Sequence, residues 1–381
     1  MGDLLACLRG WHPCLAKAEL SALLPEADLS PTPSDRWWRL GGVETSEGLE
    51  ALAVASGLQC FLVDGLVSLV EETDQDTWLE TIRLYLNQHP VSGSVAVRAW
   101  KQGGKIPGWS LTALSGRLGA VLHRQGCTID LERPDHVLAL IADGPAASLA
   151  CGWMVGDGQA AFSNGGRRAG ERPFFKPVSL DPMLARLAVN LATGPVSSGP
   201  VVDPMTGTGG FLIEAALSGR PALGIDIHSE MVHGAQANLN WACDGTPDHA
   251  RVARGDATRM ADVVPREWNG RVAGFVLDPP YGRNSHGSLD SEALLAACLR
   301  SARDIAAETA AFVLILPVHP LDPHPDDEVN LEEALPLLRG TWTDMKALIA
   351  EAGWHLHSGY VERVHRSLSR LILHARCAPQ D

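Results

Sequence analysis

The sequence lacks several features that would assign it to a specialised class of protein. No stretch reaches about eighteen uninterrupted apolar residues, so we expect no membrane-spanning helix. The N-terminus, MGDLLACLRGWHP, has no basic segment followed by an apolar one, and we expect no secretory signal. No repeat or low-complexity tract occurs. With 45% hydrophobic and 20% charged residues, the composition is that of an ordinary globular protein, for which we expect a cytoplasmic location.

The cysteines and histidines do not form metal-binding patterns. None of the eight cysteines belongs to a C-x-x-C pair, which excludes a zinc ribbon and argues against a disulfide framework. We therefore expect small, reduced and mostly buried thiols. The histidines of the acidic, proline-rich segment 319–336 lack fixed helical spacing, so we predict no metal site.

An excess of basic charge is also missing. The net charge is −14, which argues against a protein that simply coats nucleic acid. Basic residues nevertheless crowd together at 167–176 and at 363–370, and a weaker group lies at 98–105. Alone, each group is typical of a solvated surface, so its meaning depends on the neighbouring motifs.

The second half of the chain alternates short apolar runs with amphipathic stretches. Strand-like runs at 200–205, 222–227, 251–257, 273–281 and 310–318 are separated by helical patterns. Two closing runs, WHLHSGYVERV and SLSRLILHAR, are separated by little more than a turn and predict an antiparallel pair. This order predicts an α/β fold with a doubly wound, mostly parallel sheet, whose ligands bind at the carboxyl ends of the strands.

The first 160 residues are also mixed but less regular. Strand-like runs occur near LLACLR, FLVDGLVSLV, SVAVRAW, HVLALIA and SLACGWMV, with helical patterns near 13–24, 47–57, 75–88 and 110–125. Residues 157–172 are rich in glycine and charge, as linkers are. We predict an N-terminal α+β region at 1–160, a linker at 161–178 and a C-terminal domain at 179–381.

A glycine-rich turn, DPMTGTGG at 203–210, follows the first strand of the C-terminal domain. Such a turn lets the backbone approach a ligand closely. About twenty residues later Asp226 ends the next strand, where a carboxylate accepts the ribose hydroxyls of a nucleoside cofactor. The turn has neither the G-K-[ST] of a Walker loop nor the G-x-G-x-x-G of dinucleotide sites, so NTP hydrolysis is disfavoured.

Aspartates stand at the ends of four consecutive predicted strands, at Asp203, Asp226, Asp256 and Asp278. Asp256, in the sequence GDA, is placed to accept a hydrogen from an adenine amino group. Each aspartate alone would more often cap a helix or hold a turn. Four along one edge of a sheet favour a binding site instead.

Together, DPMTGTGG, GIDI, GDA and DPPY resemble the motifs of Rossmann-fold methyltransferases that use S-adenosylmethionine and act on exocyclic amino nitrogens. DPPY is the informative member, because this tetrapeptide marks transfer to nitrogen. The predicted cofactor-binding residues along these strand ends are Asp203, Thr206, Gly207, Thr208, Gly209, Asp226, Ile227, Asp256 and Ala257.

The DPPY segment predicts how a poor nucleophile is activated. The lone pair of an exocyclic amine on a nucleobase is spread into the ring. The Asp278 carboxylate and the Pro279 carbonyl would accept its two hydrogens and turn the lone pair toward the methyl group. Pro280 would fix a rigid turn, and Tyr281 would stack on the base. No metal is required.

Two further stretches, RPFFKPVSLDP at 172–182 and HRSLSR at 365–370, resemble segments of the archaeal and eukaryotic THUMP-containing tRNA guanosine-N2 methyltransferases that modify position 10. The resemblance implies an N-terminal ferredoxin-like and THUMP-type tRNA-binding region, tRNA as substrate, and Phe175 and Ser179 at the cofactor. Some relatives use a small zinc-binding activator subunit. The basic residues within or beside these stretches predict an RNA track: Arg167, Arg168, Arg172, Lys176, His365, Arg366 and Arg370.

The predicted activity is the transfer of one or two methyl groups to guanine N2, with tRNA position 10 as the leading site. Alternatives are another guanosine N2 (tRNA position 6 or ribosomal RNA), adenine N6 in DNA, and an inactive RNA-binding relative. The sequence departs from the family at Met205 and Thr206, where phenylalanine and cysteine are more usual. The insertion at 319–336 is acidic, so we do not expect it to follow phosphates.

Overall fold

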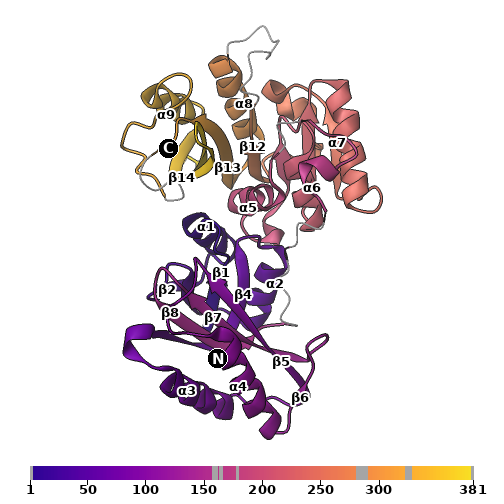
Figure 1. Cartoon of the computed structure of the whole chain (residues 1–381). Helices are drawn as coiled ribbons and strands as arrows, with labels where there is room; N and C mark the ends of the chain where they lie inside the picture. Colours follow the sequence, from indigo (N-terminus) through magenta and orange to yellow (C-terminus); the bar gives the residue numbers. More distant parts are fainter. Residues whose placement is uncertain are drawn as a thin grey trace. The chain divides into compact units, whose positions relative to one another are not determined.

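The structure, a computed structural model, describes residues 3–156, 162, 166–176, 180–279, 291–321 and 328–378. The chain divides into two compact units. The first comprises Met1–Ala53 and Gly57–Ala161, and the second comprises Val54–Ser56 and Phe162–Asp381. Each unit has its own sheet and its own hydrophobic core (Figure 1).

The first unit is built on an eight-stranded sheet of order β2-β3-β1-β4-β8-β7-β5-β6. Its first six elements follow the order βαββαβ, and β1 lies antiparallel between β3 and β4, as in ferredoxin-like folds. The long strand β4 also pairs with β8, so one sheet runs through the unit. The strands are β1 (Leu4–Leu8), β2 (Asp28–Pro31), β3 (Trp37–Gly41), β4 (Leu58–Leu69), β5 (Ser94–Gln102), β6 (Thr128–Ile129), β7 (His136–Asp143) and β8 (Ser148–Met154).

Amphipathic helices cover this sheet. Trp78 and Ile82 of α3 pack with Leu114 and Leu118 of α4 in one core that includes the buried side chains of β5, β7 and β8. These apolar residues recur at helical spacing, which is why the sequence predicts both helices. The helices are α1 (Pro13–Leu23), α2 (Thr45–Val54), α3 (Gln75–Gln88) and α4 (Leu111–Arg124).

The second unit contains a seven-stranded sheet of order β11-β10-β9-β12-β13-β15-β14. The first five strands in this order run parallel, and β15 runs antiparallel to both β13 and β14. The prediction of a mostly parallel sheet closed by an antiparallel pair is confirmed. The strands are β9 (Val201–Asp203), β10 (Ala222–Asp226), β11 (Ala250–Arg254), β12 (Val272–Leu277), β13 (Ala306–Val318), β14 (Trp354–His365) and β15 (Leu368–Cys377).

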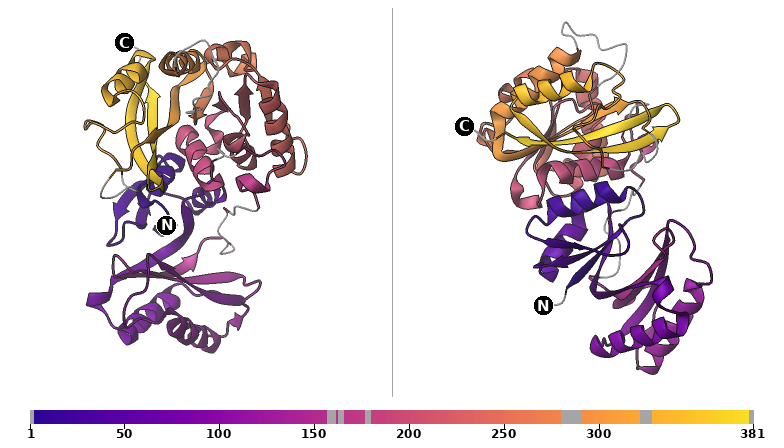
Figure 2. Two further views of the ribbon diagram at one scale, coloured as in Figure 1. Left: turned by 45° about the horizontal axis from the view of Figure 1, so that its top comes forward. Right: turned by 90° about the vertical axis from the view of Figure 1, so that its left-hand side faces the viewer.

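The order of these strands creates a switch point between β9 and β12. From β9 the chain proceeds outward through β10 to β11, whereas from β12 it proceeds in the other direction to β13. Right-handed crossovers therefore place α6 and α7 on the face opposite α8 (Figure 2). Such sheets bind ligands at the carboxyl ends beside the switch point. The helical elements are α5 (Pro182–Thr193), α6 (Gly210–Leu217), α7 (Ser229–Ala242), η4 (Ala257–Asp262), α8 (Ser291–Ile305) and α9 (Trp342–Glu351).

Three aromatic side chains form the centre of the core of the second unit. The rings of Phe275 and Phe312 stack with centroids 5.7 Å apart, and Trp354 meets them edge-on at 5.7 and 5.4 Å. They come from β12, β13 and β14. The described part of the acidic insertion also packs against this sheet, because the Val329 amide donates to the Gly359 carbonyl at 2.8 Å.

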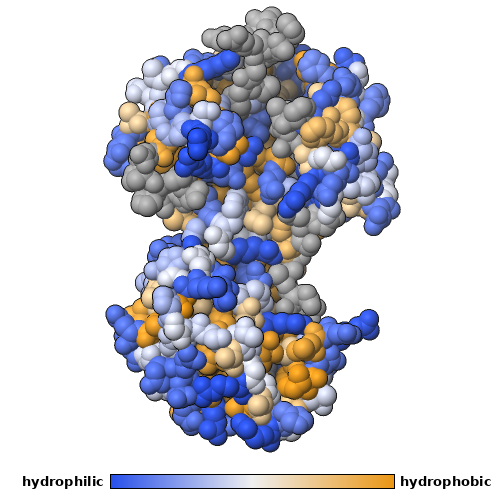
Figure 3. Space-filling view, in the orientation of Figure 1, coloured by the Kyte–Doolittle hydropathy of each residue, from blue (hydrophilic) through white to orange (hydrophobic). Residues whose placement is uncertain are grey.

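The protein has a largely polar surface and free cysteines, as its composition indicates. Figure 3 shows hydrophilic residues over most of the face drawn, with hydrophobic residues in small groups. All eight cysteines are free, as predicted. In the part of the chain that the structure describes, no helix is both long and apolar enough to cross a membrane.

Candidate active site

The glycine turn joins β9 to α6 and is tied to the neighbouring strand. Gly207 and Gly209 adopt φ values of +51° and +82°, a region that other residues rarely enter. The Asp226 carboxylate accepts hydrogen bonds from the amides of Gly207 at 3.1 Å and His228 at 2.9 Å. The Thr206 amide donates to the Ile225 carbonyl at 2.8 Å. The turn and the end of β10 therefore form one rigid unit.

The glycine turn leaves room for a ligand beside its backbone. Among the described residues, a Cβ added to Gly207 would approach only one atom within 4 Å, the Met205 carbonyl oxygen at 4.0 Å, so the turn is open on that side. Each oxygen of Asp226 has a lone pair left for a ribose hydroxyl after accepting one amide. Ile227, next along the chain, is 55% exposed and supplies an apolar surface for a base.

Asp203 lies deep below this turn, at the end of β9. Its side chain is buried and accepts a hydrogen bond from the Met205 amide at 3.4 Å. The pKa of Asp203 is raised to about 8, mainly by burial and to a smaller extent by the negative charges of Asp226 and Asp278, while hydrogen bonds from the turn oppose the shift. Asp203 is therefore largely protonated at neutral pH, and it shapes the turn as a neutral acid.

Asp256 and Asp278 complete the row of strand ends. Asp256 is exposed and caps η4, because it accepts the amide and the hydroxyl of Thr258 at 2.9 and 2.8 Å. Asp278 directly follows β12 and is partly buried. Burial raises the pKa of Asp278 to about 6, although the positive charge of Arg370 opposes the shift. Asp278 is thus mostly ionised at neutral pH and able to accept hydrogens.

The predicted site residues are only partly described. Pro279 follows Asp278 within the described chain, and Ala257 is buried at the start of η4. Three predicted residues lie outside the described residues: Ser179, Pro280 and Tyr281. Among the residues with described coordinates, no cluster of three histidine, cysteine, aspartate or glutamate side chains is arranged to hold a metal ion.

The RPFFK segment leads toward this site and is fixed by one residue that the sequence did not single out. The side-chain amide of Asn238, in α7, accepts from the Phe174 amide and donates to the Phe174 carbonyl, both at 2.8 Å. It also donates to the Thr208 carbonyl of the glycine turn at 2.9 Å. Asn238 is fully buried and holds the two motifs together. Phe175, predicted at the cofactor, is 50% exposed.

The seven predicted RNA-contacting residues lie in different environments. Arg168, His365 and Arg366 are exposed. Lys176 forms an ion pair with Glu230 at 2.8 Å, and Arg370 pairs with Glu362 at 3.2 Å.

Arg167 and Arg172 do not fit the predicted RNA track. Arg167 donates two hydrogen bonds to the carboxylate of the buried Glu214, from Nε at 3.0 Å and from Nη2 at 3.3 Å. Arg172 is only 4% exposed. A side chain buried to that degree is not available to an RNA phosphate, so the structure corrects the placement of Arg172 on the surface.

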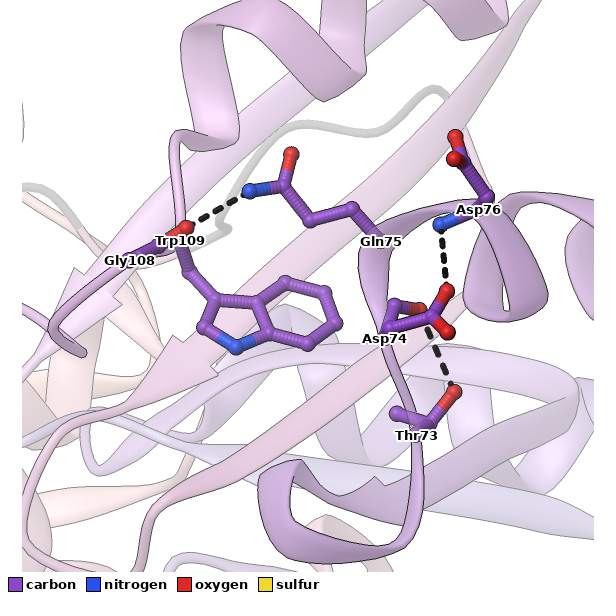
Figure 4. A pocket seen from close by; sticks show the side chains of 6 residues that line it. All are labelled: Thr73, Asp74, Gln75, Asp76, Gly108 and Trp109. Carbon is purple, nitrogen blue, oxygen red and sulfur yellow. Dashed lines mark hydrogen bonds between the residues drawn. The ribbon is translucent and has the colours of Figure 1, made fainter.

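The first unit carries a separate depression where no predicted site residue lies (Figure 4). Its polar groups already serve local structure. Asp74 caps α3 by accepting the amides of Asp76 and Thr77, and Gln75 donates to the Gly108 carbonyl at 2.6 Å. We therefore assign the chemistry to the strand ends of the second unit. The depression is lined by Thr73, Asp74, Gln75, Asp76, Gly108 and Trp109.

The strand order, the glycine turn and the strand-end aspartates define a Rossmann-like methyltransferase that uses S-adenosylmethionine. A family model described as "RMKL-like, methyltransferase domain" matches residues 169–321. The crystal structure of TrmN from Thermus thermophilus has a similar fold, with a TM-score of 0.50 at 21% identity over 98% of this chain and 99% of that one.

Sequence comparison defines the family more narrowly. A tRNA (guanine(10)-N2)-dimethyltransferase from Pyrococcus abyssi is 28% identical over 374 residues, which cover 96% of this chain and 98% of the relative. The enzyme of the same name from Methanothermobacter thermautotrophicus is 31% identical over 284 residues, or 74% and 73% of the two chains. The chain belongs to the tRNA (guanine(10)-N2)-dimethyltransferase family.

Proposed function

We propose that this protein transfers methyl groups from S-adenosylmethionine to the exocyclic N2 of guanosine 10 in tRNA. The observation that carries the proposal is the row of aspartates at neighbouring strand ends, in a chain of this family. Asp226 stands beside the open glycine turn, and Asp278 lies across the switch point at the end of β12. We assign the cofactor to the Asp226 position and the acceptor base to the Asp278 position.

S-adenosylmethionine supplies, when bound, a methyl group on a positively charged sulfur. The Asp278 carboxylate and the Pro279 carbonyl accept the two N–H groups of guanine N2 and orient its lone pair toward that methyl group. Transfer of the methyl group to N2 would leave the nitrogen positively charged, so one of its protons would have to be removed. Asp278, mostly ionised at neutral pH, is the proposed acceptor of this proton.

The cofactor is held by residues of the adjacent strand ends. Asp226 accepts the ribose hydroxyls, and Asp256 accepts from the adenine amino group with the oxygen not used in capping η4. Phe175 and Ser179 complete the proposed border of the site. Pro280 and Tyr281 are proposed to fix the turn after Asp278 and to stack on the target base.

The tRNA requires a larger surface than the active site. We propose that residues 1–160 form a ferredoxin-like and THUMP-type region that binds tRNA by shape and phosphates. The proposed linker at 161–178 leads to the proposed methyltransferase domain at 179–381, and its described residues already belong to the second compact unit. The target base has to leave its stack to reach Asp278, at the cost of a few kcal/mol. The exposed Arg168, His365 and Arg366 are proposed phosphate contacts, and a zinc-binding activator subunit stays a prediction.

The decisive experiment is to incubate the protein with unmodified tRNA and S-adenosylmethionine and to map the products by nuclease digestion and mass spectrometry. We expect one or two methyl groups on N2 of guanosine 10. An Asp278→Ala protein that still binds tRNA should lose this activity. Methyl on adenosine, or on a guanosine elsewhere, would contradict the assignment, and unchanged activity of Asp278→Ala would contradict the mechanism.

A further inference from the structure

One buried charge near the glycine turn is only partly used by the fold. The Arg172 side chain is 4% exposed, and its Nε donates to the Arg167 carbonyl at 3.2 Å. In the described part of the chain, its two terminal nitrogens, Nη1 and Nη2, have no hydrogen-bond acceptor. A guanidinium group that is buried without acceptors carries a large desolvation penalty, which an anionic partner would offset.

The carboxylate that acts most strongly on Arg172, that of Glu214, is already engaged. Glu214 in α6 accepts the guanidinium of Arg167 at 3.0 Å and that of Arg186 at 3.0 Å. Three guanidinium groups and one carboxylate leave two positive charges in excess among these four side chains. Burial lowers the pKa of Arg172 even though Glu214 opposes the shift.

One of the unsatisfied nitrogens lies at the start of α6. Nη1 of Arg172 is 3.6 Å from the position that a Cβ on Gly210 would occupy, and Gly210 is the first residue of that helix. The first amides of a helix lack partners within the helix and carry partial positive charge. Arg172 therefore adds a full charge and a planar pair of donors where the backbone already favours an anion.

The course of the strands indicates which part of the cofactor reaches this point. The adenosine end is assigned to Asp226 at β10, and the methyl group is assigned to Asp278 at β12. Strand β9 lies between these two strands, and its loop leads directly into α6. The amino-acid end of the cofactor is left for the loop and the first turn of α6. Its carboxylate is the negatively charged group of S-adenosylmethionine, and burial keeps RNA phosphates away from Arg172.

We propose that Arg172 binds the carboxylate of the amino-acid end of S-adenosylmethionine through Nη1 and Nη2. This inference rests on the cofactor of the proposed function and adds a binding residue to it. It also assigns the first residue of the RPFFK segment to the cofactor, and Asn238 to the positioning of that segment against the glycine turn.

The test compares two ligands that differ only in whether they carry the amino-acid end of the cofactor. S-adenosylhomocysteine carries the carboxylate, whereas 5′-deoxy-5′-methylthioadenosine lacks the whole amino-acid end. Both are titrated by calorimetry into the full chain and into the variants Arg172→Gln and Arg172→Lys. Arg300→Gln, which changes an exposed arginine of α8, is the control for net charge.

We expect Arg172→Gln to raise the Kd of S-adenosylhomocysteine by roughly 10- to 100-fold while the Kd of methylthioadenosine stays the same. Arg172→Lys should lie between, because it keeps the charge but not the planar pair of donors. Arg300→Gln should match the unaltered protein. Binding of methylthioadenosine shows that the site is folded. If Arg172→Gln does not fold, Arg172→Lys tests the proposal instead: its Kd for S-adenosylhomocysteine should rise relative to its Kd for methylthioadenosine.

Equal weakening of both ligands, or no change in either, would overturn the proposal. The assay contains no RNA, so its outcome is independent of the substrate. A protein that binds S-adenosylhomocysteine through Arg172 but does not methylate guanine N2 would refute the proposed function alone. If the unaltered protein methylates guanosine 10 and the Arg172→Gln variant binds S-adenosylhomocysteine with an unchanged Kd, this inference alone is refuted.

Discussion

At the scale of single residues, identical side chains acquire different chemistry from their place along the sheet edge. Asp203, buried at the end of β9, has a pKa raised to about 8. Asp278, partly buried beyond β12 and near Arg370, has a pKa raised to about 6. At neutral pH the first is mostly a neutral acid and the second mostly a carboxylate. Burial thus separates a structural aspartate from one that is able to accept a proton.

The raised pKa of Asp278 predicts an acid limb in the rate profile. Protonation removes the hydrogen acceptor, and it occurs near pH 6 rather than near the ordinary value of 3.8. We expect the single-turnover rate of tRNA methylation to fall about tenfold per pH unit below about pH 6. Cofactor affinity, measured across the same range, separates chemistry from binding. A rate that stays constant down to pH 5 would contradict this role.

The raised pKa of Asp203 predicts a stability that falls with pH. The folded state holds this proton more tightly than the unfolded chain, so the stabilisation is present below about pH 4 and is lost as pH rises toward 8. In Asp203→Asn this dependence disappears. Between pH 4.5 and 8, the unfolding free energy of the unaltered protein should fall relative to the variant by on the order of 4 kcal/mol. Urea unfolding at both pH values measures it, and parallel curves would count against the buried acid.

At the scale of elements, the most informative contact joins a helix to a segment without regular structure. Asn238 of α7 binds the backbone of Phe174 twice and the glycine turn once. Gly234, one turn earlier in α7, leaves room for the Phe174 ring, because an added Cβ would lie 2.2 Å from that ring. The helix therefore positions both the RPFFK segment and the cofactor turn.

Replacing Asn238 with leucine should disturb both the RPFFK segment and the glycine turn. The variant loses three buried hydrogen bonds, and we expect it to lower the unfolding free energy by roughly 3 kcal/mol. It should also weaken S-adenosylhomocysteine binding, because Thr208 loses its support. Asn240→Leu, two residues further in the same helix, is the matched control, because the Asn240 side chain accepts a hydrogen bond from Gln236 of the same helix. Equal melting temperatures and affinities of the two variants would refute the positioning role.

The sequence could predict these elements only where the signal is local. Apolar runs that end in aspartate predicted β9, β10 and β12, and helical spacing predicted α3 and α8. Strands β2 and β3 were not predicted, because Asp28–Pro31 is short and ends in proline, and WWRLG shows no clean alternation. Asn238 was missed because its partner Phe174 is 64 residues away. An asparagine on the apolar face of a helix, beside Ala235 and Leu239, was the available signal.

At the scale of the whole molecule, the chain combines an acidic total charge with a nucleic-acid substrate. The net charge of −14 predicts weak nonspecific binding, so affinity for tRNA must come from local basic groups and shape. Each unit has its own core, and the proposed cofactor residues all belong to the second.

This division predicts where the cofactor product stabilises the molecule. At 100 times its Kd, S-adenosylhomocysteine should stabilise the fold by about 2.7 kcal/mol. In hydrogen-exchange mass spectrometry we expect slower exchange in peptides covering 203–212 and 224–228. Peptides covering β5 of the first unit should exchange at unchanged rates. Protection spread evenly over both units would contradict a site built from the second alone.

The place of β15 in the sheet also has a consequence for biosynthesis. This strand lies between β13 and β14, and its residues Leu371–Leu373 are fully buried, yet it follows every other strand along the chain. During translation the second unit cannot close its sheet until residue 377 has left the ribosome. Until then the open edge of β13 and the apolar surface around Phe312 stay uncovered. We therefore expect the nascent chain to need protection by chaperones, and a stop codon before β15 to yield an aggregating product rather than a shortened enzyme.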